Sequence, residues 1–515
     1  MAAIVTDQFR IANATNFVNS VGDPSNSYYV FVSLPNPSQV GFGRVQNWDN
    51  NIPNPVDSFD YMDHYHDTMI FGRLINKSNI RRLIRRIDWT AGTKYEMYRQ
   101  DYSILNPSPI TQSYRLYDAN YYVMNSDYRV YICVDNGSSG INTTGNASQD
   151  QPTFTDLEPS PAGVSGDGYV WKYLFTVSPS DIIKFDSTEY ITVPNDWENS
   201  SDPSIQAVRQ NADSSVNQNQ IKKVYIADGG QGYSGGVGQQ FNILGDGTGA
   251  TVLVDVVGGS IVKTTVTSGG SGYTYGVVDT GSISANASRA AKLIPVIPPS
   301  NGHGYDLYKE LGTDKVLVYA RFDDSTKDFP IDTKFAQVGI VKNPTSFGST
   351  SNFTDTQYSS LYGIKFSSYS GSISVGDIIK QSVTGGTALG YVASFDTQTN
   401  VLKYFRDRSL YYNPTTQDQT DYIGISTGGK VLNFESTSNA VFTSGGFQAA
   451  VDVNFTGITT NPTGNAVISL GMNFTRGLAS PDINKTSGEI IYIDNRPLIS
   501  RNSRQKEDIK IILEF

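Results

Sequence analysis

The sequence predicts a mainly β fold, and three observations support this prediction. Apolar residues make up only 38% of the 515 residues, whereas the chain contains 48 Gly and 22 Pro. Aromatic residues make up 12% of the chain and are led by 32 Tyr and 24 Phe, residue types that favour strands. Most segments alternate in the manner of strands between clusters of Gly, Pro, Asn and Ser. Many short strands with exposed turns fit this composition better than a large helical core does.

Two segments have the spacing of short helices. Residues 6–21 begin with Thr6 and Asp7, an N-cap residue and a first-turn acid, and continue with apolar residues at helical intervals. In residues 79–87, four aliphatic residues would lie on one helical face and four arginines on the other. The aliphatic residues are Ile80, Leu83, Ile84 and Ile87, and the arginines are Arg81, Arg82, Arg85 and Arg86.

Residues 166–175 form the clearest strand pattern in the sequence. Gly166, Asp167 and Gly168 supply the residues of a turn, and the alternation that follows places four aromatic rings on one face. The four rings belong to Tyr169, Trp171, Tyr173 and Phe175. A broad aromatic face of this kind can pack against a second sheet.

Two further segments have the pattern of small β modules. In residues 218–295, the Gly-Gly-x-Gly-Tyr motif of residues 229–233 recurs at residues 269–273. We expect the glycines to adopt positive φ and each tyrosine to fill its turn. Residues 349–475 combine short strands with tight turns, which is typical of a small barrel or a stack of hairpins.

The end of the chain is predicted to contain two strands. A strand beginning near Glu489 leads to a turn that carries Asn495 and Pro497. In residues 508–515, the apolar residues alternate with polar ones and therefore share one face.

Both ends of the chain resemble the baseplate wedge proteins of T-even-like contractile-tailed phages, specifically their β-sandwich dimer subunit. The resemblance covers residues 1–200, 310–346 and 478–515 approximately, and Arg86, Asp88 and Trp89 resemble an Arg-x-Asp-Trp signature of that family. The residues that carry the resemblance are Phe9, Arg86, Asp88, Trp89, Gly166, Asp167, Gly168, Tyr169, Trp171, Glu489, Tyr492, Asn495, Arg496 and Pro497.

The resemblance implies a multilayer antiparallel β-sandwich core with a few short helices in loops and two inserted β modules. The implied organisation is a core in residues 1–217, a Gly/Tyr-repeat module in 218–295, more core in 296–348, a barrel-like or hairpin module in 349–475, and C-terminal core strands in 476–515. It further implies a homodimer that binds other wedge proteins in the virion baseplate, after synthesis in the host cytoplasm. Such a subunit takes part in baseplate assembly and in rearrangement on host attachment.

Composition argues against several other classes of function. The net charge of −10 and the pI of about 4.9 disfavour extensive phosphate contacts, so no nucleic-acid partner is predicted. Cys133 is the only cysteine and lies in an apolar run, where a buried and inert thiol is expected. No signal peptide is visible, and no apolar run approaches the roughly 18 residues that a membrane span needs.

The four arginines of residues 79–87 permit two interpretations. Such a cluster is compatible with nucleic-acid contact, or with pairing to acidic groups of a protein. The resemblance at Asp88 and Trp89 favours a structural or interface role, with Trp89 as an anchor residue.

Two motifs suggest bound groups, and each has a simpler explanation. Gly230, Gly232 and Gly235 fit a dinucleotide fingerprint, but residues 234–238 do not have the pattern of a helix start. Residues 63–67 gather two histidines with two aspartates, and the pair His64 and His66 could ligate a metal on a strand, since both rings would then share one face. The glycines are better interpreted as a turn, and residues 63–67 as a surface or interface segment. No metal or cofactor is therefore predicted.

The favoured function is therefore that of a structural protein rather than an enzyme. The acid pairs at residues 323–324 and at Asp156 with Glu158 resemble glycosidase carboxylates, but 49 acidic residues make such pairs inevitable. The alternative is a carbohydrate-binding or depolymerising tail-associated protein, suggested by the Tyr-rich β repeats. A dehydrogenase-like enzyme is supported only by the glycine fingerprint.

Overall fold

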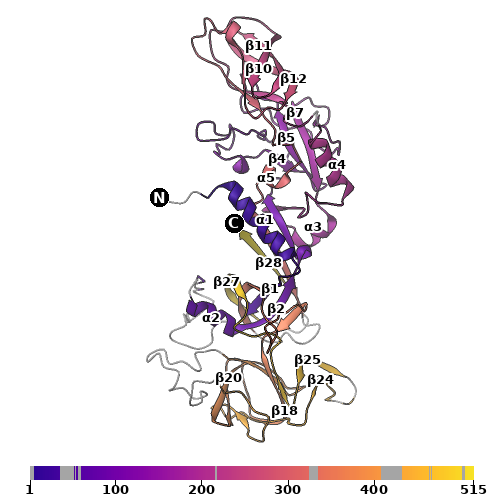
Figure 1. The fold of residues 1–515 in the computed structure, drawn as a ribbon, viewed down its shortest axis with the longest axis vertical. Helices are drawn as coiled ribbons and strands as arrows, with labels where there is room; N and C mark the ends of the chain where they lie inside the picture. Colours follow the sequence, from indigo (N-terminus) through magenta and orange to yellow (C-terminus); the bar gives the residue numbers. More distant parts are fainter. Residues whose placement is uncertain are drawn as a thin grey trace. The chain divides into compact units, whose positions relative to one another are not determined.

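The chain folds into two compact units, which are described separately. The computed structural model describes residues 5–34, 52, 54–55, 59–214, 217–323, 334–406, 432–462, 464, 467–500 and 505–515. Unit 1 comprises Met1–Phe17, Arg81–Leu317 and Ile512–Phe515, and unit 2 comprises Val18–Ile80 and Val318–Ile511. The predicted mainly β fold is confirmed, because antiparallel strands build both units and the helices are few and short (Figure 1).

Unit 1 contains most of the helices that the structure describes. They are α1 (Asp7–Gly22, which continues into unit 2), η3 (Leu116–Asp118), α3 (Pro179–Phe185), α4 (Pro203–Ala212), η4 (Gly281–Ile283) and α5 (Leu307–Leu311). The strands are β3 (Ile80–Arg85), β4 (Tyr122–Met124), β5 (Arg129–Asn136), β6 (Ser160–Pro161), β7 (Tyr169–Thr176), β8 (Tyr190–Val193), β9 (Lys223–Asp228), β10 (Gln239–Gly245), β11 (Thr248–Val257), β12 (Ser260–Ser271), β13 (Gly276–Val278), β14 (Lys292–Val296) and the start of β15 (Lys315–Phe322).

The central sheet of unit 1 has the strand order β4-β5-β7-β6. β7 pairs with β5, and α4 lies beside β7 (Figure 1). The aromatic residues predicted to share a face of this strand are all buried, and Trp171 and Tyr169 are fully buried. Cys133 of β5 is also fully buried, as predicted, and burial raises the pKa of its thiol well above the usual value.

The predicted helix at residues 6–21 is confirmed as α1, whereas the predicted helix at residues 79–87 is wrong. This segment is the strand β3, paired with β8. Arg82 is 1% exposed, and its guanidinium lies 3.9 Å from the centre of the Tyr308 ring. A cation–π contact thus allows a charged residue to occupy an inward strand position. Arg82 occupies a buried position where a strand pattern would have an apolar residue. The spacing of the remaining aliphatic residues therefore matched a helical period.

The Gly/Tyr repeat of unit 1 has the predicted geometry. Gly230 and Gly232 have φ of +66° and +79°, and Gly270 and Gly272 have +61° and +76°. Each tyrosine fills its turn, as Tyr273 illustrates: it is 1% exposed, and its hydroxyl donates to the Ile243 carbonyl oxygen at 2.9 Å. The strands around these turns form the sheet β12-β11-β10-β13 and the pair β14-β9.

The described residues of unit 2 include a five-stranded sheet, a two-stranded sheet and one closed barrel. Its helices are α2 (Phe59–Thr68) and η2 (Lys77–Asn79). Its strands are β1 (Tyr28–Ser33), β2 (Met69–Ile75), the larger part of β15, β16 (Lys334–Lys342), β17 (Gln357–Ser359), β18 (Tyr362–Ser370), β19 (Ile378–Val383), β20 (Gly386–Asp396), β21 (Val401–Phe405), β22 (Val441–Phe442), β23 (Gln448–Val451), β24 (Gly457–Thr460), β25 (Ile468–Phe474), β26 (Leu478–Ala479), β27 (Glu489–Ser500) and most of β28 (Glu507–Glu514).

The barrel follows the order β21-β20-β19-β22-β23-β18, and β21 also pairs with β18. This last pairing closes the sheet on itself, so these strands leave no open edge between them. Buried aromatic and aliphatic side chains fill the interior, among them Phe366 and Phe447, whose ring centres lie 6.0 Å apart. Outside the barrel, the five-stranded sheet has the order β17-β2-β1-β16-β27, and β24 pairs with β25 in the two-stranded sheet.

The predicted turn at Asn495 and Pro497 is wrong, because β27 continues through both residues to Ser500. Phe335 of β16 pairs with Ile499 and Gln337 pairs with Asn495, so the register shifts between them and the strand bulges. β27 is the outermost strand of its sheet, and an outer strand with a bulge tolerates the missing N–H of proline. The predicted strand at residues 508–515 is confirmed as β28, with the more buried side chains at alternate positions.

Candidate functional site

The Arg-x-Asp-Trp segment is bound to other parts of unit 1. The Arg86 guanidinium lies 3.0 Å from Asp88 Oδ2 and 3.1 Å from Asp186 Oδ1. Trp89 is partly buried, and its indole N–H donates to Ser148 Oγ at 3.0 Å. These contacts join the end of β3 to the loop after α3 and to the loop after β5, so the segment holds unit 1 together locally.

The other arginines of β3 also bind groups within unit 1. Arg81 pairs with Asp181 at 2.9 Å, and Arg85 donates to the carbonyl oxygens of Asp118 and Ala119 at 3.1 and 3.0 Å. Arg82 is buried against Tyr308, as described above. Since these arginines are occupied inside the protein, the nucleic-acid interpretation of the cluster loses its support.

The segment of residues 166–171 fixes the start of β7. Gly166 and Gly168 have φ of +66° and +86°, a conformation that favours glycine. Between them, Asp167 accepts from the backbone N–H of Tyr169 at 2.9 Å. The ring of Tyr169 then stacks on Trp171 with 5.3 Å between the ring centres. This turn therefore positions the aromatic core of unit 1.

The C-terminal signature residues lie on the outer strand β27. Tyr492 pairs with Ile340 and Glu489 with Lys342, both on β16. Asn495 Oδ1 accepts from the side-chain amide of Gln337 at 3.0 Å, and Arg496 pairs with Asp494 at 2.6 Å.

The disfavoured hypothesis of a His-x-His metal site on a strand fails, because residues 63–67 belong to helix α2. Side chains two positions apart on a helix point in different directions, so the shared face that the metal hypothesis needs is lost. His66 is 9% exposed, whereas the side chains of Asp63 and His64 lie outside the described residues, as does residue 324 of the acid pair 323–324. In the described part of the chain, no group of three His, Cys, Asp or Glu residues is placed to hold a metal ion.

The dinucleotide fingerprint is also explained by local structure. Gly230, Gly232 and Gly235 all have positive φ and follow strand β9 in a turn that leads to β10, with no helix between them. A dinucleotide site needs a helix N-terminus at this point. The sequence match is therefore produced by turn glycines.

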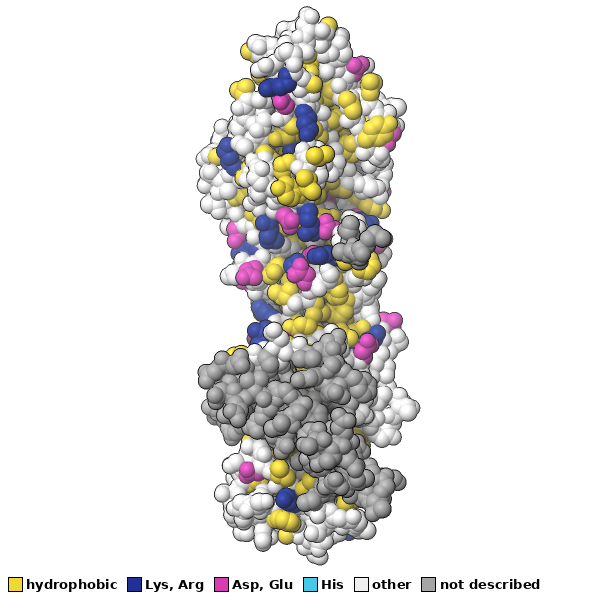
Figure 2. Space-filling view, turned by 90° about the vertical axis from the view of Figure 1, so that its left-hand side faces the viewer, with side chains coloured by type: hydrophobic (Ala, Val, Ile, Leu, Met, Phe, Trp, Pro, Cys, Tyr) yellow, Lys and Arg dark blue, Asp and Glu magenta, His cyan; other side chains and the backbone are white. Residues whose placement is uncertain are grey.

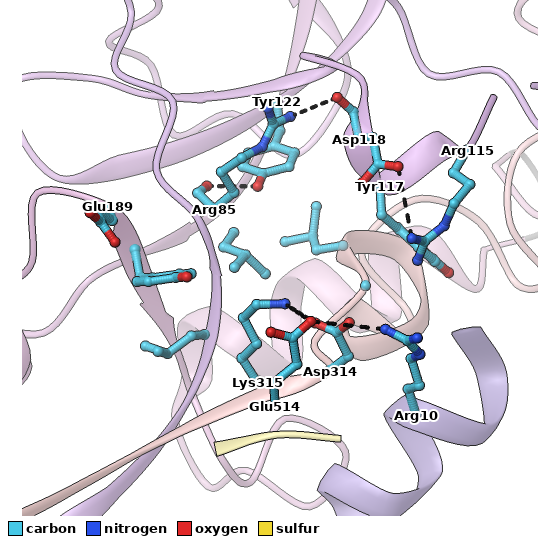
Figure 3. Close-up of a pocket in the computed structure, with 15 residues that line it drawn as sticks. Arg10, Arg85, Arg115, Tyr117, Asp118, Tyr122, Glu189, Asp314, Lys315 and Glu514 are labelled. Carbon is cyan, nitrogen blue, oxygen red and sulfur yellow. Dashed lines mark hydrogen bonds and ion pairs between the residues drawn. The ribbon is translucent and has the colours of Figure 1, made fainter. Parts of the chain in front are cut away.

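Unit 1 also has a charged cleft of about 430 Å³, which was not predicted (Figure 3). Its charged lining consists of four basic residues, Arg10, Arg85, Arg115 and Lys315, and four acidic residues, Asp118, Glu189, Asp314 and Glu514. Lys315 Nζ lies 3.1 Å from Glu514 and 3.2 Å from Asp314. Because the two signs balance, the cleft suits a protein surface of mixed charge better than a polyanion.

The surface drawn in Figure 2 has the same mixed character, with basic, acidic and apolar side chains interspersed. On α1, Phe9 is 57% exposed, and nearby Val5 is 50% exposed. A large exposed aromatic residue beside paired charges is typical of a protein contact surface. No helix in the described ranges combines the length and apolar character that crossing a membrane requires.

Comparisons with known proteins connect this β-rich chain with a phage family. Residues 158–231 match the family described as Bacteriophage T4, Gp8. The chain is also 28% identical over 230 residues to a curated protein, the baseplate wedge protein gp8 of Enterobacteria phage T4. That match covers 39% of this chain and 63% of the relative, which is less than two thirds of its length. The resemblance to phage baseplate wedge proteins is thus confirmed.

Proposed function

We propose that this chain is a structural subunit of a contractile phage tail baseplate wedge. The observation that carries the proposal is the match of residues 158–231 to the Gp8 family, together with the similarity to a baseplate wedge protein. The mixed-charge cleft and the exposed Phe9 support a function in protein binding. In this proposal the chain is made in the host cytoplasm, binds itself and neighbouring wedge proteins, and takes part in baseplate assembly and rearrangement.

Co-expression with the proteins encoded beside it tests this function. We expect a dimer that joins a larger complex of defined mass, measured by light scattering after gel filtration. Replacing Phe9 with serine is expected to weaken the complex at least tenfold, because truncation of an aromatic hot-spot residue costs about 2 kcal/mol or more, and about 1.4 kcal/mol corresponds to a factor of ten.

The replacement Tyr275→Ser is the matched control, since Tyr275 is 61% exposed and lies away from α1, at the edge of β13. If Phe9→Ser forms the complex as the wild type does, the exposed Phe9 face of α1 does not belong to the interface. A wild-type chain that stays monomeric beside every neighbour would contradict the wedge function itself, and glycan binding would then support the tail-associated alternative.

We also propose that two segments are additions to the family core: residues 349–475, and the part of residues 218–295 that follows the family match, which ends at residue 231. Strand β9 lies within the family match, and its Tyr225 packs in the main hydrophobic cluster of unit 1. The test therefore keeps the β9–β14 pair and replaces residues 231–289 with a short Gly-Ser linker. We expect the variant to assemble as the wild type does in the same light-scattering experiment; loss of assembly from a folded variant would show that the module itself binds a partner.

A further inference from the structure

A buried lysine, an asparagine and a glutamate are in contact beside β7, and the function proposed above does not use them. Lys172 is 2% exposed, and its Nζ donates to the Leu157 carbonyl oxygen at 2.6 Å and to Asn211 Oδ1 at 2.8 Å. Both partners are neutral, although a buried ammonium group normally requires a paired acid. Burial accordingly lowers the pKa of Lys172 to about 8, so much of the amine is neutral in mildly alkaline solution.

The Asn211 carboxamide connects this amine to a carboxylate. Asn211 lies near the end of α4, and its Nδ2 donates to Glu158 Oε1 at 2.6 Å. Asn217 Nδ2 donates to the same oxygen at 2.8 Å and holds Glu158 in place. Burial raises the pKa of Glu158, but the hydrogen bonds from Asn217 and Asn211 outweigh this effect and keep it below its ordinary value. Glu158 is therefore ionised and able to accept a proton.

The distances bring the amine within reach of the amide carbon. A carbonyl bond is about 1.2 Å long, so Asn211 Cγ lies no more than about 4 Å from the Lys172 nitrogen. Reacting atoms in a near-attack arrangement are about 3–3.5 Å apart, and such proximity accelerates an intramolecular reaction strongly. A rotation about the Cε–Nζ bond turns the nitrogen lone pair toward Cγ.

We propose that Lys172 and Asn211 join in an isopeptide bond with the assistance of Glu158. The neutral amine attacks Cγ and forms the new C–N bond. Glu158 accepts the proton that the nitrogen loses and delivers it to Nδ2, with which it already shares a hydrogen bond. The Cγ–Nδ2 bond then breaks and ammonia leaves. An amine and a primary amide become a secondary amide and ammonia, without oxidation or reduction.

The product fits the surroundings better than the reactants do. A secondary amide is neutral at every pH, so the cost of burying an ionisable amine disappears. Its single N–H can still donate to the Leu157 carbonyl oxygen, which lies 2.6 Å from Nζ before reaction. The bond would link β7 covalently to α4 inside unit 1.

The first test is the intact mass of the purified wild-type chain. After incubation at pH 9, we expect a loss of about 17 Da, the mass of the released ammonia, and a branched proteolytic peptide that joins Lys172 to Asn211. A mass equal to that of the unmodified sequence would overturn the proposal and leave Lys172 as a hydrogen-bond donor only. The measurement does not depend on the phage context, so its result is separate from that of the wedge proposal.

Two variants at exposed neighbouring positions test the role of the carboxylate. With Glu158→Gln, we expect the mass loss to slow at least tenfold, because the group that relays the proton is gone. Asp156→Asn is the matched control: this exposed acid lies two residues away, and cross-linking should proceed as in the wild type. Equal rates in the two variants would refute the assignment of Glu158, whereas Asn211→Ala should abolish the mass loss.

Discussion

Replacing Trp171 with alanine is expected to destabilise unit 1 by about 4 kcal/mol, because truncation of a buried tryptophan leaves a cavity that the core fills only in part. Trp171 is fully buried, stacks on Tyr169, and meets the Tyr95 ring edge-on with 5.8 Å between the ring centres. The free energy of unfolding, measured by urea titration with circular dichroism, gives the size of the effect.

Tyr114→Ala is the control for this experiment. The Tyr114 side chain is 57% exposed, so its loss is expected to change the free energy of unfolding by no more than about 0.5 kcal/mol. If both variants unfold at the same urea concentration as the wild type, the packing of Trp171 against Tyr95 and Tyr169 does not contribute measurably to the stability of unit 1.

Replacing Asp101 with alanine is the second change with a large expected effect. Arg99 is 2% exposed, and its guanidinium donates to both carboxylate oxygens of Asp101 at 2.9 and 2.8 Å. The same guanidinium lies 4.0 Å from the centre of the Tyr225 ring. Removing the aspartate leaves a buried positive charge without its acid, which typically costs about 3–5 kcal/mol. Thermal unfolding at pH 7 measures the loss.

The matched control removes an acid from an exposed ion pair. Asp186 pairs with Arg86, but its side chain is 52% exposed, and such pairs contribute at most about 1 kcal/mol. If Asp101→Ala and Asp186→Ala lower the thermal stability equally, the burial of Arg99 does not make its ion pair with Asp101 more important than an exposed pair. Because the Arg99 guanidinium lies against the Tyr225 ring, we also expect faster hydrogen exchange of the β9 backbone amides in Asp101→Ala, and no such change in Asp186→Ala.

The sequence predicted elements whose pattern is local and uninterrupted. The N-cap residue and the spacing of apolar residues were sufficient for α1, and the alternating aromatic residues were sufficient for β7. Prediction was wrong for β3 because Arg82 is an inward residue with a tertiary partner, Tyr308, that is far away in the sequence. It was also wrong at Pro497, since the position of β27 at the edge of a sheet is not visible in the strand itself.

The candidate site was less predictable than the fold, because its residues also depend on partners that are far away in the sequence. The motif with Arg86 and Trp89 was recognised, but its partners Asp186 and Ser148 lie 100 and 59 residues away from them. The charged cleft collects charged residues from α1, β3, η3, β15 and β28, and of these only Arg85 stood out in its own segment. Likewise, Glu158 stands out in the sequence only as an acid near Asp156, whereas its hydrogen-bond partners, Asn211 near the end of α4 and Asn217 beyond it, lie 53 and 59 residues away.

The discontinuity of the two units has a consequence for the order in which the protein folds during synthesis. Unit 1 includes both Met1–Phe17 and Ile512–Phe515, so it cannot be completed until the last of these residues has left the ribosome. The barrel strands, by contrast, all come from one stretch between Tyr362 and Val451 and can pair while later residues are still being translated. Nascent unit 1 therefore lacks the contacts of Ile512–Phe515, such as the ion pair of Glu514 with Lys315, until these residues are translated, which predicts that unit 1 is completed later than the barrel.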